Sequence, residues 1–513
     1  MILVLLTLLA VTQAGPPLAD LLVRARDHIE AGDEAAARAD LEEALRSHPE
    51  SPVVRNFLGV LAASAGDYEE AERRFREAVQ RDPQYPDAWL NLGRLYQENA
   101  AQDPGAPGKA VAAYEAILGH EPEQREARFQ VAALRQALGE FERSQAELSR
   151  LLPEDRARPA ALAVACANHV GRGDREEADA AGEKLLAHRD LAAEHVRPIL
   201  PVLASHGRDD LLVRIVETLR QRGLAASADL EALGAAYARQ GQLALSREAL
   251  EAAARSRPDD AALLLALARV AYEQGDREGA LGYLGHARAV TPEDPGVHLF
   301  LGMVCVELDL GAEAYAALGE AVRLDPDSPE ANYAYGSVAM HRKDPTEALP
   351  YFSRYSELRP DDYRGPYAVG VALFLAKHYE AARTQLLPFA ERQETAAGAS
   401  YLLARIARAL NEEEEALRLA RRAVEADPRS ADGYSELGFL YQRVGEVERA
   451  EEALTRCLEI DPDHYLGNLH LLLLYSRTRD PRRAEQQERF DELRKRRAEQ
   501  AADLVRPVEI RPY

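Results

Sequence analysis

The chain has 513 residues, 47% of them hydrophobic, and a formal net charge of −23 at pH 7. A single compact core rarely grows to this size, so the chain must divide into domains or extend as a repeat array. The negative charge opposes a nucleic-acid partner, which needs a basic surface, and it opposes non-specific docking on an anionic membrane.

Residues 2–11 form an uncharged apolar run that only Thr7 interrupts. Thr12 and Ala14 then place small residues at the −3 and −1 positions of a signal-peptidase site. Ten apolar residues suit a secretory signal and are too few to span a bilayer as a helix. We therefore expect residues 1–14 to be a signal peptide cleaved after Ala14, and the protein to be periplasmic or secreted. No later stretch predicts an integral membrane segment in the mature chain.

The rest of the chain is punctuated by prolines at a fixed spacing. Steps of 34 residues connect Pro49 with Pro83, and the same step recurs in the second half of the chain. The prolines on this second frame are Pro258, Pro292, Pro326, Pro360, Pro428 and Pro462. A fixed period of this length is typical of a repeat architecture.

Within each period the same residue types return at the same positions. With Pro52 as position 1, the marked positions are 7, 8, 20, 24, 27 and 32, and they hold Leu58, Gly59, Ala71, Phe75, Ala78 and Pro83. In the unit that starts at Ala431 they hold Leu437, Gly438, Ala450, Leu454, Cys457 and Pro462, and Tyr434 and Tyr441 take positions 4 and 11.

This pattern resembles the tetratricopeptide repeat (TPR), with an aromatic residue at 4, Leu-Gly at 7 and 8, Tyr at 11, Ala at 20 and 27, and Pro at 32. The resemblance covers residues 18 to about 497. It implies an all-α fold, a right-handed superhelical solenoid of stacked antiparallel helix pairs. Positions 4, 7, 8 and 11 give helix A one apolar face, and positions 20, 24 and 27 do the same for helix B. One pair cannot bury its own faces, so neighbours must stack.

The repeats divide the chain into segments of different regularity. We expect an N-terminal TPR array over residues 18–226, degenerate from about 125, and a C-terminal TPR array over 227–464. Residues 465–504 have the charged helical pattern of capping helices. Residues 505–513 contain Pro507 and Pro512, which bar a helix, and are expected to form an extended tail.

No sequence motif for catalysis or metal binding stands out. Cys166, Cys305 and Cys457 are far apart and fall on packing positions, so buried hydrophobes are expected there. Gly105 to Lys109 lacks the glycine spacing of a phosphate loop. Arg172-Gly173-Asp174 spells an integrin-type tripeptide but falls where the turn between helices A and B is expected. We predict no catalytic residues, no metal and no cofactor, and hence a protein that is not an enzyme.

The candidate ligand-binding residues lie on helix A. In the TPR family, positions 2, 5, 9 and 12 of helix A point into the concave groove, as the resemblance implies for this chain. Tyr is large and rigid with a polar tip, which suits recognition of a peptide or a glycan. Packing between repeats is the alternative role for these tyrosines. The residues chosen are Tyr333, Tyr367 and Tyr401 at position 5, Arg269 and Arg405 at position 9, and Tyr272, Met340 and Phe374 at position 12.

The function expected from the sequence is a non-enzymatic, exported scaffold that presents its groove to a partner protein or peptide. An alternative is a component of an exopolysaccharide or cell-envelope assembly or secretion system. The carboxylate clamp of some family members is not supported, because position 5 offers no matching lysine. Repeats occupy nearly every residue, which leaves no room for a separate catalytic domain.

Overall fold

The computed structural model of the chain describes residues 16–341 and 345–503. These residues form helices joined by short loops, with no strand among them, which confirms the all-α prediction. The predicted signal peptide (1–14) and extended tail (505–513) lie outside the described residues. The chain divides into two compact units, Met1–Ala253 and Ala254–Tyr513. The predicted array boundary at 226/227 rests on repeat regularity, a different criterion, and stays a prediction.

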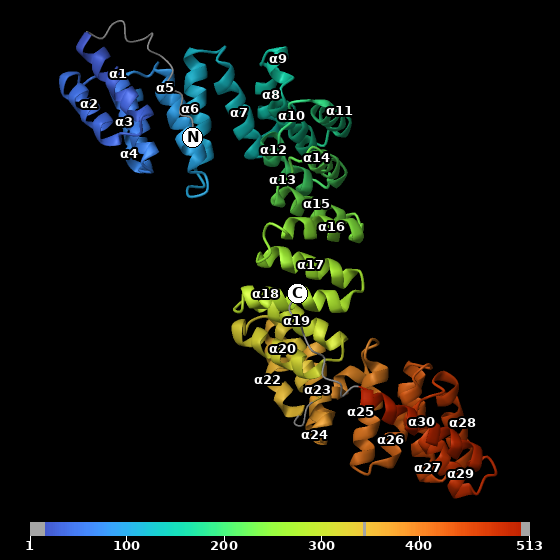
Figure 1. Cartoon of the computed structure of the whole chain (residues 1–513). Coiled ribbons are helices and arrows are strands. Elements are labelled where there is room, and N and C mark those ends of the chain that lie inside the picture. Colours follow the sequence, from blue (N-terminus) through green and yellow to red (C-terminus); the bar gives the residue numbers. More distant parts are fainter. Residues whose placement is uncertain (1–15, 342–344, 504–513) are drawn as a thin grey trace. The chain divides into compact units, whose positions relative to one another are not determined.

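Consecutive helices within each unit pack as antiparallel pairs (Figure 1). The helices of the first unit are α1 (Pro16–Glu30), α2 (Glu34–Ser47), α3 (Pro52–Ser64), α4 (Tyr68–Arg81), α5 (Pro86–Glu98), α6 (Ala106–His120), α7 (Arg125–Ala137), α8 (Phe141–Ser149), α9 (Pro153–Arg156), α10 (Pro159–Arg172), α11 (Arg175–Ala187), α12 (Ala193–Val196), η2 (Arg197–Ile199), α13 (Leu200–Ser205), α14 (Asp209–Gln221), α15 (Ser227–Arg239) and α16 (Leu243–Ala254).

The second unit continues the same alternation of helix A and helix B. Its helices are α17 (Ala261–Glu273), α18 (Arg277–Val290), α19 (Pro295–Glu307), α20 (Gly311–Leu324), α21 (Pro329–Ala339), η3 (Pro345–Ala348), α22 (Leu349–Leu358), α23 (Arg364–Leu375), α24 (Tyr379–Leu386), η4 (Leu387–Ala390), α25 (Ala396–Ala409), α26 (Glu413–Ala426), α27 (Ala431–Val444), α28 (Val447–Ile460), α29 (Tyr465–Thr478) and α30 (Arg483–Asp503). The last two cover most of the segment predicted to cap the array.

Local sequence sets where each helix begins and ends. Pro52 opens α3 behind an N-cap, Ser51, whose hydroxyl accepts a hydrogen bond from the Val54 amide. The turn from A to B needs a left-handed residue at position 15, and Gly66 and Gly275 supply it with φ of 78° and 82°. Glycine therefore ends helix A at both of these turns.

Close approach of the two helices in a pair depends on glycine at position 8. A Cβ added at Gly59 would lie 2.6 Å from the Phe75 ring, and one added at Gly438 would lie 2.6 Å from Leu454. The side chain at position 24 therefore fills the space that the glycine at position 8 leaves empty.

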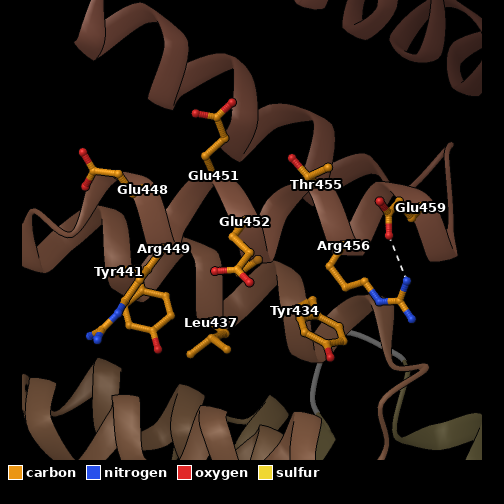
Figure 2. Close-up of a pocket in the computed structure, with 11 residues that line it drawn as sticks. Tyr434, Leu437, Tyr441, Glu448, Arg449, Glu451, Glu452, Thr455, Arg456 and Glu459 are labelled. Atoms are coloured by element: carbon orange, nitrogen blue, oxygen red, sulfur yellow. Dashed lines mark hydrogen bonds and ion pairs between the residues drawn. The ribbon is translucent and has the colours of Figure 1, made fainter.

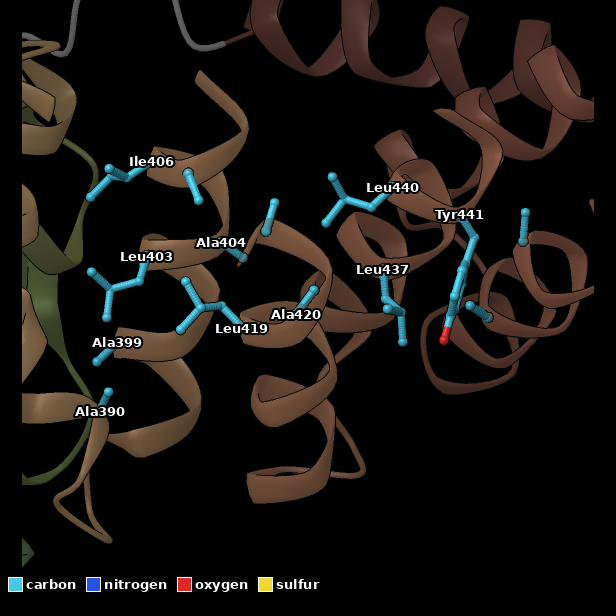
Figure 3. Packing of buried hydrophobic residues seen from close by; sticks show 14 of the residues in the cluster. Ala390, Ala399, Leu403, Ala404, Ile406, Leu419, Ala420, Leu437, Leu440 and Tyr441 are labelled. Carbon is cyan, nitrogen blue, oxygen red and sulfur yellow. The ribbon is translucent and has the colours of Figure 1, made fainter. Parts of the chain in front are cut away.

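The core continues from one pair to the next. Figure 3 shows part of one cluster in the second unit, in which side chains of α25, α26 and α27 interlock. This cluster extends from Phe374 to Tyr475 and includes Leu403, Leu419 and Leu437. Each pair thus buries its apolar faces against its neighbours, which is the stacking that a repeat too small for its own core requires.

Polar side chains also join successive repeats, at two positions of the frame. At position 4, a ring or amide nitrogen hydrogen-bonds the carbonyl of the proline six residues earlier. The pairs are Trp89 with Pro83 (2.9 Å), His298 with Pro292 (2.8 Å), Asn332 with Pro326 (2.8 Å) and Asn468 with Pro462 (3.0 Å).

At position 11, a tyrosine hydroxyl forms a hydrogen bond with a side chain of the preceding helix B. The pairs are Tyr96 with Glu72 (2.8 Å), Tyr237 with Glu217 (3.0 Å), Tyr441 with Arg421 (3.0 Å) and Tyr475 with Glu451 (3.2 Å).

The three cysteines are free and buried, as predicted. Burial raises the pKa of the Cys166 and Cys457 thiols to about 12 and that of Cys305 to about 11. A thiol with such a pKa is a poor nucleophile near neutral pH. The cysteines therefore act as small apolar side chains.

Candidate functional site

The predicted site residues lie on one row of helix A side chains in the second unit. We call this row the A-face and define it as positions 5, 9 and 12 of α17, α19, α21, α23 and α25. Helical geometry places these positions along one side of each helix. The A-face residues are Leu265, Arg269, Tyr272, Leu299, Met303, Val306, Tyr333, Ser337, Met340, Tyr367, Val371, Phe374, Tyr401, Arg405 and Arg408.

Two of the predicted tyrosines are fixed against helix B of their own repeat. The Tyr333 ring lies 5.7 Å from Phe352 and 5.0 Å from Tyr355, between ring centroids. The Tyr367 ring lies 5.4 Å from Phe389 at a nearly perpendicular angle. Both rings are half-buried, so each offers only part of its surface to a ligand.

Tyr401, Arg405 and Phe374 come together from neighbouring repeats. The Arg405 guanidinium donates a hydrogen bond of 3.2 Å to the Tyr401 hydroxyl. Its carbon lies 4.9 Å from the centre of the Phe374 ring and 5.4 Å from that of Tyr401. Burial raises the pKa of Tyr401. Stacking on two rings holds Arg405 in place through cation–π attraction.

Tyr272 belongs to a contact between α17 and α19. Its ring meets Phe300 edge-on at 5.6 Å, and its hydroxyl donates to the Glu307 carboxylate. The Arg277 guanidinium stacks 3.9 Å from the ring centre and pairs with the same carboxylate. Hydrogen bonds from Tyr272 and Arg277 lower the pKa of Glu307. This side chain therefore joins two repeats as well as lining the A-face.

The remaining predicted residues differ in exposure. Met340 is half-buried against a cluster that contains Phe352, and Phe374 is buried. Arg269 is exposed and forms no ion pair with a described residue. The structure thus brings Tyr401, Arg405 and Phe374 into mutual contact and leaves Arg269 apart from them.

Two exposed apolar residues of the A-face were absent from the predicted set. Met303 and Val306, at positions 9 and 12 of α19, expose 45% and 50% of their surface. They lie about one turn apart on the same side of α19 and together form a small exposed apolar pair. Their frame positions can be read from the sequence, but neither residue is aromatic or basic, and residue type alone does not distinguish them from packing residues.

A separate hollow of about 850 Å³ lies over α27 and α28. Figure 2 shows Tyr434, Leu437 and Tyr441 along it, with several charged side chains of α28. Arg456 pairs with Glu459 at 2.8 Å. Side chains of both charge signs line the hollow, so it selects no clear partner chemistry, and it contains none of the predicted residues.

The motifs that mimic known sites have structural roles. Lys109, in the first turn of α6, pairs with Asp103 of the preceding loop at 2.7 Å. Gly173 is the left-handed residue of an A–B turn, with φ of 81°, and Arg172 pairs with Asp174 across it at 3.2 Å. Among the described residues, no group of three or more His, Cys, Asp or Glu is arranged to hold a metal ion. No described helix is both long and apolar enough to cross a membrane.

Profiles of the tetratricopeptide repeat match the chain along its length. One matches residues 22–86, 58–103 and 306–363, and others match 237–304, 397–430 and 431–464. Together these matches cover more than half of the sequence. The chain belongs to the tetratricopeptide repeat family. The resemblance inferred from the 34-residue frame is therefore confirmed, and the helix pairs within the matched residues are TPR units.

Several solved structures are similar to parts of this TPR protein. A tetratricopeptide repeat protein from Parabacteroides merdae is 17% identical over 48% of this chain and 98% of its own, with a TM-score of 0.40. The C-terminal part of a TPR protein from Cytophaga hutchinsonii is 15% identical over 46% and 98%, with a TM-score of 0.39. Yeast Tom70 is 14% identical over 89% and 92%, with a TM-score of 0.37. These likenesses carry no information about ligands.

Proposed function

We propose that this TPR protein is a protein-binding scaffold whose A-face forms a concave groove for a segment of a partner. The observation that carries the proposal is the exposure of Met303 and Val306 on α19. Two apolar side chains in water cost free energy that a partner recovers by covering them, at roughly 25 cal/mol per Å² of buried apolar surface. Half-buried tyrosines on the neighbouring helices add rigid contact area.

The A-face residues contribute to binding in different ways, depending on how each side chain is packed. Tyr333 and Tyr367 are already ordered by their own helix B, so binding costs little side-chain entropy there. Met303 has a flexible side chain that adapts to the partner's surface. The proposed groove therefore combines preorganised rings with one adaptable apolar patch.

A capture experiment tests this surface. The full chain, Met303→Ser/Val306→Ser and Val444→Ser are immobilised and exposed to an extract of the native cell envelope. Val444 is an exposed apolar residue outside the A-face, at the end of α27, and serves as the matched control. We expect the double variant to lose the proteins that the other two retain. Equal capture by all three would remove the A-face as the binding surface.

We also propose that the scaffold works outside the cytoplasm, after removal of residues 1–14. The support is the apolar run and the small residues before Gly15 in the sequence. Mass spectrometry of the native protein tests this. A mature N-terminus at Gly15 is expected, and an intact Met1 in the native protein would contradict export by this route.

A further inference from the structure

The charge on the A-face is opposite to that of the whole protein. Its fifteen positions contain three arginines and no carboxylate, and position 2 of the same helices adds one residue of each sign, Glu330 and Arg364, although the chain as a whole has a net charge of −23. Arg408 is neutralised by Glu436 at 2.6 Å, and Arg405 is stacked on Phe374 and Tyr401. Arg269 remains exposed without an ion-pair partner among the described residues.

Arg269 stands beside the exposed apolar patch. It occupies position 9 of α17, as Met303 does of α19, and the two helices meet through the rings of Tyr272 and Phe300, 5.6 Å apart. One free cation therefore borders two free apolar side chains. An arginine binds a carboxylate through parallel hydrogen bonds, and an ion pair at the edge of an apolar contact fixes the register of a bound segment.

We infer that the A-face selects a partner segment in which an acidic side chain adjoins apolar ones, with the carboxylate on Arg269 and the apolar residues over Met303 and Val306. This inference rests on the proposed function and specifies its partner chemistry. Because the A-face contains no carboxylate and only one arginine that is neither paired nor stacked, its overall charge discriminates only weakly between acidic and basic segments. Arg269 therefore supplies most of the selectivity for charge. Reversing that one charge should therefore reverse the preference.

The test is selection from a random twelve-residue peptide library displayed on phage, with the full chain as bait. Arg269→Glu is compared with Arg288→Glu, an exposed arginine on α18 that lies off the A-face. We expect the wild type and Arg288→Glu to enrich peptides in which Asp or Glu adjoins apolar residues. The Arg269→Glu variant should bind these synthetic peptides at least about tenfold more weakly and should enrich Lys or Arg instead.

The outcomes separate this inference from the proposed function. Enriched peptides that bind Arg269→Glu as tightly as the wild type, or that contain no excess of acidic residues, overturn the inference. If Met303→Ser/Val306→Ser still abolishes their binding, the A-face remains the binding surface. If neither variant changes binding, or if the wild type enriches no peptide, both the inference and the proposed A-face surface fail. Circular dichroism confirms that each variant is folded.

Discussion

Two kinds of repeat in the second unit differ at adjacent frame positions. In α27 and α29, position 11 is a buried tyrosine that bonds the preceding helix B, and position 12 is polar. In α17, α19 and α21, position 11 is small and position 12 is large. The position 11 and 12 pairs are Tyr441-Gln442 and Tyr475-Ser476 in the first group, and Ala271-Tyr272, Cys305-Val306 and Ala339-Met340 in the second.

This difference shows how the same 34-residue frame can either strengthen the interface between repeats or line the A-face. One residue along a helix turns the side chain by about 100°, so a shift from position 11 to 12 moves bulk from the repeat interface to the A-face. The α27 and α29 repeats use their large residue to hold neighbours together. The α17 to α21 repeats place theirs on the A-face, where Val306 is exposed and Tyr272 and Met340 are half-buried.

The largest expected effect tests what the two kinds of repeat share. Phe352 and Leu454 both occupy position 24 and are fully buried against the glycine at position 8. Phe352→Ala should lower the free energy of unfolding by about 3–5 kcal/mol and Leu454→Ala by about 2–5 kcal/mol, because each leaves a cavity. Urea unfolding followed by circular dichroism measures both. A loss below about 1 kcal/mol in either variant would show that its helix pair does not pack as described.

The next effect concerns His470, which lies in α29 against the Phe439 ring at 4.6 Å. Burial, with smaller contributions from Arg408 and His464, lowers its pKa to about 4. The neutral ring therefore stabilises the fold fully above the unfolded pKa of about 6.5, and this contribution is lost as pH falls from 6.5 towards 4, by about 2–3 kcal/mol. The His470→Gln variant should show a flatter dependence of unfolding free energy on pH in that window. An unchanged slope would mean that His470 is solvated.

A smaller effect isolates the polar contact that distinguishes α29. Tyr475→Phe removes the hydroxyl that donates to Glu451 at 3.2 Å and leaves the ring in place. The expected cost is about 0.5–1.5 kcal/mol. The double variant Tyr475→Phe/Glu451→Gln shows whether the two losses are coupled. Full additivity would indicate that the hydroxyl and the carboxylate do not interact.

The smallest effect concerns the A–B turns. Gly445 supplies the left-handed residue between α27 and α28, with φ of 85°, whereas Lys377 has to adopt φ of 63° between α23 and α24. A non-glycine residue in this left-handed region destabilises the folded state by about 1 kcal/mol. Glycine avoids this cost, but its greater entropy in the unfolded chain offsets part of the gain. Lys377→Gly should therefore stabilise the protein by about 0.5 kcal/mol, and Gly445→Ala should destabilise it by about 1 kcal/mol. A destabilised Lys377→Gly would point to a contact of the lysine side chain.

The sequence specified the repeats well because backbone signals determine them. The proline frame, the glycines at position 15 and the close approach at Gly59 depend on steric limits that residue type alone reveals. The buried cysteines followed from the same frame. Family membership and helix pairing were therefore predictable without coordinates.

The contacts of individual side chains were less predictable. The frame places Tyr333 on helix A but does not fix its rotamer, so its packing on Phe352 and Tyr355 appears only in the structure. Position 4 was read as an apolar packing site, yet Trp89 and Asn332 also use it to bond a proline carbonyl. The roles of these residues depend on partners in the other helix of the same repeat or across a turn, which pattern alone does not reveal.

The most direct test of the A-face is photocrosslinking in the native cell. A photoreactive amino acid replaces Met303, at position 9 of α19, in one strain and Ser476, at position 12 of α29, in another. The account predicts that Met303 crosslinks to a discrete partner and that Ser476 does so weakly or not at all. Equal crosslinking at both sites, or crosslinking at Ser476 alone, would contradict it.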